Sequence, residues 1–177
     1  MKAKRYALLL ALLKAMDERG SWCGETHVQK ASYFLQVATN VPLDLDFILY
    51  KHGPYSFDLH EGLGDMRARL LIDVKQRAPY GPSLIPGPSA QVLADGLSDY
   101  VAAHNLAIDF VAQKLSGHGV VDLERLATAL YVIRNYPGEA DKAQVMNELK
   151  PHILREKAAE ALAEVENALE QARRLGS

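Results

Sequence analysis

A mainly helical fold with a small antiparallel β-sheet is what this 177-residue sequence predicts. Three features lead to that prediction. Apolar residues recur at intervals of three and four over most of the chain, which is typical of helices packed on one face. The early exception is FILY at 47–50, an aromatic and β-branched run typical of a short strand. Two further short runs, at 70–74 and 83–85, flank a turn at 78–82 and indicate a hairpin.

The first two helices are predicted at about 4–18, ending at Gly20, and from Thr26 to Thr39, with Thr26 as N-cap. The first carries leucines nearly all round, so we expect it to lie buried between neighbours; a partner-binding surface is the alternative. Its MKAKR start resembles a signal peptide, but Lys14 interrupts the apolar run, which favours a core helix. The second helix is expected to turn three polar side chains to solvent: Gln29, Lys30 and Gln36.

The stretch at 47–58 is predicted to organise the fold. FILY would be a buried strand, stopped by a turn at Gly53 and Pro54. Ser56 would then cap a helix from about Phe57 to Arg69. Helices followed by a hairpin are typical of a winged helix, so residues 1–88 are interpreted as winged-helix-like, with the 47–50 strand beside the wing.

Residues 89–177 are predicted to be helical and to pack on the first part within a single domain. We expect a helix at 90–104 that runs on or kinks into a second one at 106–115. The next helix is expected at 122–135, with Asp122 as its cap, and a short helix follows up to about 149. The last helix would run from 151 or 154 to 175. Its apolar seam would pack on the body or on a second copy, so a homodimer through this helix is a further expectation.

Composition limits the function. The chain is 49% apolar and 24% charged, as in ordinary globular proteins, and its net charge is −2. Residues 1–90 carry 11 Lys or Arg against 9 Asp or Glu, so a polyanion contact is expected only in this half. The single cysteine, Cys23, excludes an internal disulfide and suits the cytoplasm. No apolar run approaches the ~20 residues that span a bilayer, so no membrane partner is expected.

Four motifs resemble a bacterial group. THVQKASYFLQ, LDFILYKHGPYSFDL, LERLATALYVI and ELKPH are similar to small helical proteins of the YwgA type, to the Panacea antitoxin domain and to the toxin-neutralising C-terminal domain of DarG antitoxins. The resemblance implies a winged-helix-like, non-enzymatic domain in toxin neutralisation or phage defence. In the DarG group it implies a DNA-modifying ADP-ribosyltransferase as the partner.

Two binding surfaces are candidates. Tyrosines are frequent in protein-interface hot spots, which favours a partner site on the turn and the wing. Its residues would be Tyr50, Lys51, His52, Gly53, Pro54, Tyr55, Ser56 and Tyr80. The alternative for Tyr50 and Tyr55 is that they pack the turn onto the second helix. The second surface would make the chain a DNA-binding regulator that contacts phosphates through Arg67, Arg69, Lys75 and Arg77.

Catalytic chemistry is not expected. His52, Ser56 and Asp58 could act as a hydrolytic group only if the nucleophile, the base and the group that orients the base lay within hydrogen-bond reach of one another. Three residues across one turn seldom achieve that geometry. No two histidines have i, i+4 spacing and no CxxC occurs, so no metal is predicted. No GxGxxG or Walker loop occurs, so no cofactor is predicted. The sequence therefore predicts a non-enzymatic protein that binds a partner protein.

Overall fold

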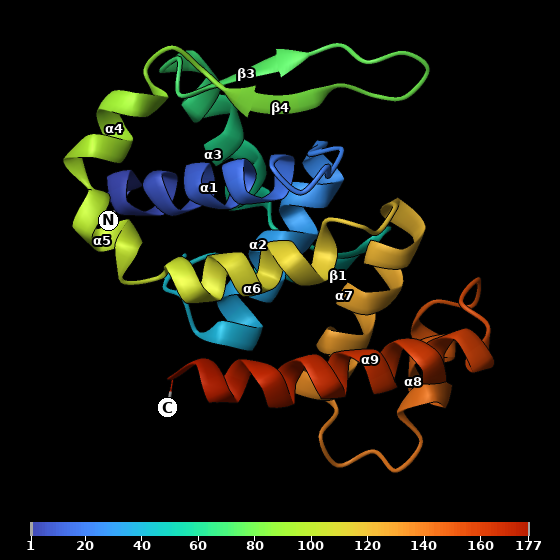
Figure 1. Cartoon of the computed structure of the whole chain (residues 1–177). Coiled ribbons are helices and arrows are strands. Elements are labelled where there is room, and N and C mark those ends of the chain that lie inside the picture. The colour runs from blue at the N-terminus through green and yellow to red at the C-terminus, as the bar shows by residue number, and fades with distance from the viewer. Residues whose placement is uncertain (1, 177) are drawn as a thin grey trace.

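The computed structural model describes residues 2–176, and it confirms a mainly helical fold with small antiparallel sheets (Figure 1). Helix α1 (Lys2–Asp17) is buried along most of its length, as its leucine content predicts. Helix α2 (Glu25–Thr39) begins after Gly24, whose extended backbone forms the N-cap, so the predicted cap Thr26 lies inside the first turn. Both helices therefore belong to the core.

The central stretch forms a hairpin of its own. Strand β1 (Ile48–Tyr50) pairs antiparallel with β2 (Gly53–Tyr55). The prediction of a buried strand stopped at Gly53 and Pro54 was wrong on both points. β1 is largely exposed, and the Gly-Pro pair lies in the second strand. Proline is tolerated there because each strand of a two-stranded sheet has one unpaired edge, and a proline whose nitrogen lies on that edge removes no ladder hydrogen bond.

Helix α3 (Phe57–Ala68) starts where the sequence predicts. The Ser56 side chain accepts a hydrogen bond from the Leu59 backbone N–H at 3.2 Å, which confirms its role as N-cap. This bond satisfies one of the free N–H groups of the first helical turn. The chain therefore passes from β2 into α3 at a fixed, fully buried residue.

A second hairpin follows α3. Strands β3 (Ile72–Lys75) and β4 (Ser83–Pro86) pair antiparallel, as predicted for the wing. It extends over α3 and α1 at one end of the molecule (Figure 1). The Ser83 hydroxyl donates to the Trp22 carbonyl at 2.6 Å, and Leu84 N–H donates to the Cys23 carbonyl at 2.9 Å. The two hairpins form separate sheets, so the expectation that 47–50 lies beside the wing was wrong.

The predicted helix at 90–104 is divided. It consists of α4 (Ala90–Gly96) and α5 (Ser98–Ala102), and α6 (Asn105–Leu115) follows. The first break comes directly after Gly96, a weak helix former. Helix α7 (Val120–Asn135) begins at Gly119 in extended conformation, so Asp122 is inside its first turn and not its cap.

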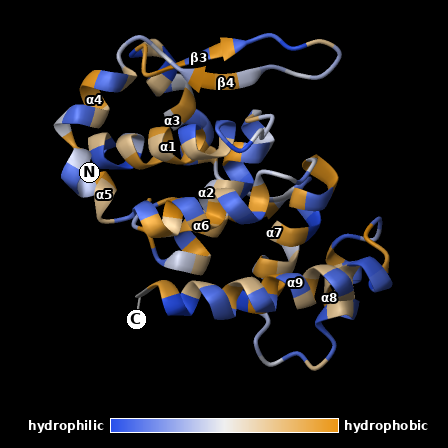
Figure 2. Cartoon of the chain, in the orientation of Figure 1, coloured by the Kyte–Doolittle hydropathy of each residue, from blue (hydrophilic) through white to orange (hydrophobic). Residues whose placement is uncertain are grey.

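The chain ends with α8 (Lys142–Leu149), α9 (Arg155–Arg173) and the short 3₁₀ helix η1 (Arg174–Gly176). Hydrophobic and hydrophilic residues alternate along α9 (Figure 2). Its apolar seam packs on α7 and α8 of the same chain. The buried positions of that seam are Ala158, Ala161, Leu162, Val165, Ala168 and Ala172. The seam that suggested a homodimer is thus covered within one chain.

Candidate functional site

The β1–β2 hairpin has an outer and an inner face. Its register places Ile48 opposite Tyr55 and Leu49 opposite Pro54. Successive residues of a strand point to opposite sides, so Ile48, Tyr50 and Tyr55 share the outer face. The inner face lies toward the body, where Pro54 is buried. The candidate functional site is built from these two faces.

Gly53 lets the hairpin lie close to α7. Its φ is +85°, a left-handed conformation that favours glycine. A Cβ at this position would lie 3.1 Å from the Thr128 Oγ1 atom and 3.4 Å from the Glu124 carbonyl oxygen. A side chain here would therefore crowd α7 and would strain the left-handed backbone.

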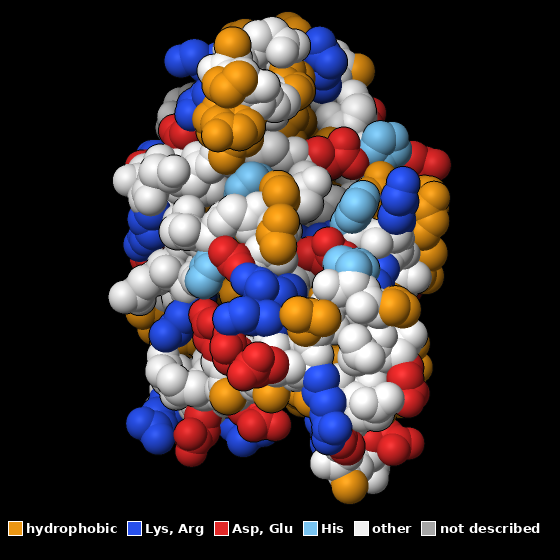
Figure 3. Space-filling view, turned by 90° about the vertical axis from the view of Figure 1, so that its right-hand side faces the viewer, with side chains coloured by type: hydrophobic (Ala, Val, Ile, Leu, Met, Phe, Trp, Pro, Cys, Tyr) orange, Lys and Arg blue, Asp and Glu red, His pale blue; other side chains and the backbone are white. Residues whose placement is uncertain are grey.

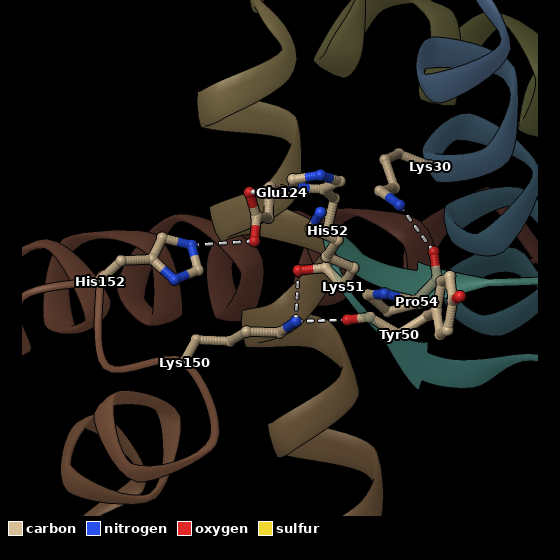
Figure 4. Close-up of polar contacts among 8 residues, drawn as sticks. All are labelled: Lys30, Tyr50, Lys51, His52, Pro54, Glu124, Lys150 and His152. Atoms are coloured by element: carbon tan, nitrogen blue, oxygen red, sulfur yellow. Dashed lines mark hydrogen bonds and ion pairs between the residues drawn. The ribbon is translucent and has the colours of Figure 1, made fainter.

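Three side chains hold the inner side of the hairpin and the Ser56 that follows it, and Figure 4 draws two of them, Lys30 and Lys150. The Lys30 Nζ atom of α2 donates to the Pro54 carbonyl at 2.8 Å. Gln29 makes two bonds of 2.9 Å with the backbone of Ser56, one from its amide nitrogen and one to its amide oxygen. Lys150, just after α8, donates to the carbonyls of Tyr50 and Lys51. The expectation that Gln29 and Lys30 face solvent was therefore wrong.

Charge is concentrated behind the hairpin. Burial lowers the pKa of Lys30 from 10.5 to about 8, and burial also lowers the pKa of Lys150. The Glu124 carboxylate acts in the opposite direction on both lysines. It lies 3.0 Å from the His152 Nε2 atom and 3.7 Å from the His52 Nδ1 atom, between the two rings (Figure 4). Two buried ammonium groups thus hold the hairpin backbone, while the Glu124 carboxylate contacts the side chain of His52 in the turn.

Two hollows adjoin this charged group on either side of the turn. One of about 270 Å³ is lined by α2 and the hairpin, and one of about 550 Å³ is lined by the start of α7. They share Thr26, Lys51 and His52. Figure 3 shows histidine side chains next to acidic ones on this side of the molecule. The Lys51–His52 turn therefore forms part of the wall of both hollows.

The outer face carries an exposed aromatic group, continued by the first residue of α3. The ring of Tyr50 lies 5.6 Å from those of Tyr55 and Phe57, and the last two are 5.2 Å apart. Ile48, Tyr50 and Phe57 are 48%, 52% and 51% exposed. We call Ile48, Tyr50, Tyr55 and Phe57 the aromatic patch. Such a patch is rarely left uncovered without a reason.

Glu25 adjoins the patch from the start of α2. Its Oε1 atom accepts a hydrogen bond from the Tyr55 hydroxyl at 3.2 Å and lies 2.8 Å from the His60 Nδ1 atom. Burial raises the pKa of Tyr55, and the neighbouring Glu25 carboxylate raises it further. A carboxylate thus lies directly beside the rings.

The predicted partner-binding residues divide into three groups. Those at the surface are Tyr50, Lys51 and His52, with Tyr55 half-buried. Gly53, Pro54 and Ser56 are buried, so they position the hairpin and offer no contact area. Tyr80 lies on the turn of the other hairpin, where its ring packs on Trp22 at 5.2 Å. The structure therefore does not bring Tyr80 into the group around Tyr50.

Sequence reasoning missed two kinds of residue. Ile48 and Phe57 belong to the aromatic patch, and the alternation of 48, 50, 55 and 57 across a hairpin was the signal that identifies them. Glu124 and Lys150 lie behind the hairpin, and Lys150 is 99 and 100 residues away from the two groups that it binds. No local pattern could have linked that lysine to the turn.

The basic residues of the DNA-binding alternative are not equally available. Arg69 Nε lies 3.0 Å from an oxygen of Asp65. Arg77 lies 3.8 Å from Asp17 and over the Trp22 ring. The two remaining members, Arg67 and Lys75, are exposed. Two of the four side chains are therefore already engaged in contacts within the protein.

The residues weighed for chemistry lie apart. Ser56 caps α3 and is fully buried, while His52 points to Glu124, so the two do not form a hydrolytic group. Cys23 is buried, and burial raises the pKa of its thiol. Within residues 2–176 no three His, Cys, Asp or Glu side chains come together as metal ligands would. The same residues contain no helix with the length and apolar character of a membrane span.

The chain was also compared with known proteins. No family model matches it, and no curated protein matches it in sequence.

Proposed function

We propose that this protein binds a partner protein through the aromatic patch and the adjoining Lys51–His52 turn, and that it neutralises or regulates that partner. The resemblance of the QK…YFLQ and GPYS motifs to antitoxin domains supports the antitoxin-like or defence-associated form of this proposal. The contacts that hold the hairpin support the part of the proposal that concerns binding to a partner protein.

The observation that carries the proposal is an exposed group of aromatic rings on a hairpin fixed from behind. Two of the three rings, those of Tyr50 and Phe57, are about half exposed, as is Ile48 on the same face, and the three rings contact one another. Aromatic side chains supply much of the binding energy at protein interfaces, because they bury large areas with few torsions to restrict. Fixing the backbone in advance reduces the entropy that binding would otherwise cost. The bonds from Gln29, Lys30 and Lys150 supply that fixation.

DNA binding is less well supported. Phosphate contacts need several free cations on one surface, and non-specific affinity depends on their number. Arg69 and Arg77 contact carboxylates of this chain, and the net charge is −2. A protein partner on the aromatic patch is therefore the better explanation of the exposed residues.

Site-specific photocrosslinking tests the proposal in the source cell. A photoreactive phenylalanine derivative would replace Phe57 in the full chain, and adducts formed on irradiation would be identified by mass spectrometry. Control positions are Tyr80 and Val92, which are 71% and 76% exposed and lie outside the patch. We expect one protein to be crosslinked from position 57 and not from the controls. The protein identified in the adduct would then be purified on its own, and its binding to the unmodified chain measured by calorimetry.

Two results would count against the proposal. Equal crosslinking of the same protein from Val92 would mean that the contact is random. An adduct with nucleic acid from position 57 would favour the DNA-binding alternative.

A further inference from the structure

The aromatic patch is bordered by carboxylates. Glu25 lies beside the Tyr55 hydroxyl, Asp58 follows Phe57 in the chain, and Glu61 is one helical turn further along α3. Residues at i and i+4 of a helix lie on the same face, so Glu61 is on the side of α3 that carries Phe57. Asp58 and Glu61 are exposed.

Cations near the patch are few. Residues 47–61, which hold the hairpin and the start of α3, contain the carboxylates of Asp58 and Glu61 and one lysine, Lys51. The ammonium groups of Lys30 and Lys150 lie behind the hairpin and are bonded to backbone carbonyls. His60 contacts the Glu25 carboxylate from α3. The outer side of the hairpin thus combines exposed rings with an excess of negative charge.

This combination selects the chemistry of the partner. We propose that the aromatic patch receives a basic segment of a protein, in which apolar side chains alternate with arginine or lysine. The inference rests on the proposed function and specifies its partner. Apolar side chains cover Ile48 and the ring edges, while a guanidinium or ammonium group lies over a ring face near Glu25 or Glu61.

Two physical effects favour that occupant. The face of an aromatic ring attracts a cation through its quadrupole, and arginine is the commonest partner. Carboxylates at the rim of an interface add attraction at a distance and suppress acidic partners. The same carboxylates repel phosphates, so a nucleic acid would be disfavoured even though its bases stack on aromatic rings.

Fluorescence anisotropy with two synthetic peptides tests the inference on the full chain. In one labelled peptide leucines alternate with arginines, and in the other glutamates replace the arginines. We expect the arginine peptide to bind more tightly, and Phe57→Ala to weaken it by about tenfold. The triple variant Glu25→Gln, Asp58→Asn and Glu61→Gln should weaken it by roughly tenfold too, since each exposed ion pair contributes little alone. Added salt should weaken the arginine peptide's binding to the wild-type chain.

A matched control separates local from overall charge. Asp95→Asn, Glu139→Gln and Glu166→Gln remove the same number of carboxylates, all of them exposed, from α4, the α7–α8 loop and α9. This variant should bind the arginine peptide as the wild type does. Thermal unfolding of both triple variants would verify that they are folded, and the salt series on the wild type needs no variant at all.

The inference and the proposed function fail in different ways. Equal affinity for the two peptides, or unchanged affinity in the patch triple variant, would overturn the inference. So would an acidic segment in the adduct formed from position 57, although that adduct would still support the proposed function. If no protein is crosslinked from position 57 and Phe57→Ala changes nothing, the proposed function fails as well.

Discussion

Replacing Lys30 with methionine should change how the stability of the protein depends on pH. The Lys30 side chain is only 2% exposed, and burial lowers its pKa from 10.5 to about 8. Below about pH 8 the lysine is protonated in both the folded and the unfolded state. Between about pH 8 and 10.5 the unfolded state binds about one proton more, so the free energy of unfolding rises with pH.

The size of this effect follows from the shift. One pH unit corresponds to about 1.4 kcal/mol for one proton. From about pH 7.5 to about pH 9.5, the wild type should therefore gain about 2 kcal/mol relative to Lys30→Met. Other groups act in the opposite direction at high pH, because burial raises the pKa of Cys23 and that of Tyr6 to about 12. The difference between the two proteins removes their contribution.

Urea unfolding followed by circular dichroism across this pH range gives the required free energies. Lys75→Met is a matched control, since this lysine is exposed on β3, and its curve should run parallel to that of the wild type. If the Lys30→Met curve is also parallel, Lys30 does not have a lowered pKa, and the account of a buried charged group behind the hairpin is refuted.

Four further predictions concern stability and accessibility. Ser56→Ala should lower the free energy of unfolding by about 1 kcal/mol, because α3 loses its cap; urea unfolding would measure this, and no change would refute the capping role. Gly64→Ala should raise it by roughly 0.5–1 kcal/mol, because a Cβ there meets nothing within 4 Å and alanine favours the helix. Gly53→Ala should instead lower it, and a reversed order in the same assay would contradict the described backbone. Cys23 should react with Ellman's reagent only on unfolding, so rapid reaction of the native protein would show that the thiol is accessible.

The parts of the fold that were predictable depend on local signals. Ser56 is a helix cap because the groups that it satisfies lie three residues away, and the leucines of α1 indicate burial by composition alone. Gly53 and Pro54 were predicted to end the strand because that pair usually does so. They can instead form a strand that pairs with β1 because no third strand needs the N–H group that Pro54 lacks, and no local pattern encodes that absence.

The site was less predictable than the fold, because its interior comes from distant segments. Lys30 lies in a helix where a lysine is normally exposed, and it is buried only because the hairpin returns over it with a free carbonyl. Lys150 lies directly after α8, 99 residues along the chain from Lys51, whose carbonyl it binds. The aromatic residues of the turn were visible in the sequence, whereas the charged group that fixes them needed the three-dimensional arrangement.

The affinity of the partner captured through position 57 tests the central claim most directly. Its dissociation constant would be measured by calorimetry for the wild type, for Phe57→Ala and for Tyr80→Ala, another exposed aromatic residue outside the patch. The account predicts a loss of about tenfold or more for Phe57→Ala and a change within about twofold for Tyr80→Ala. A large loss for Tyr80→Ala with unchanged binding by Phe57→Ala would contradict it.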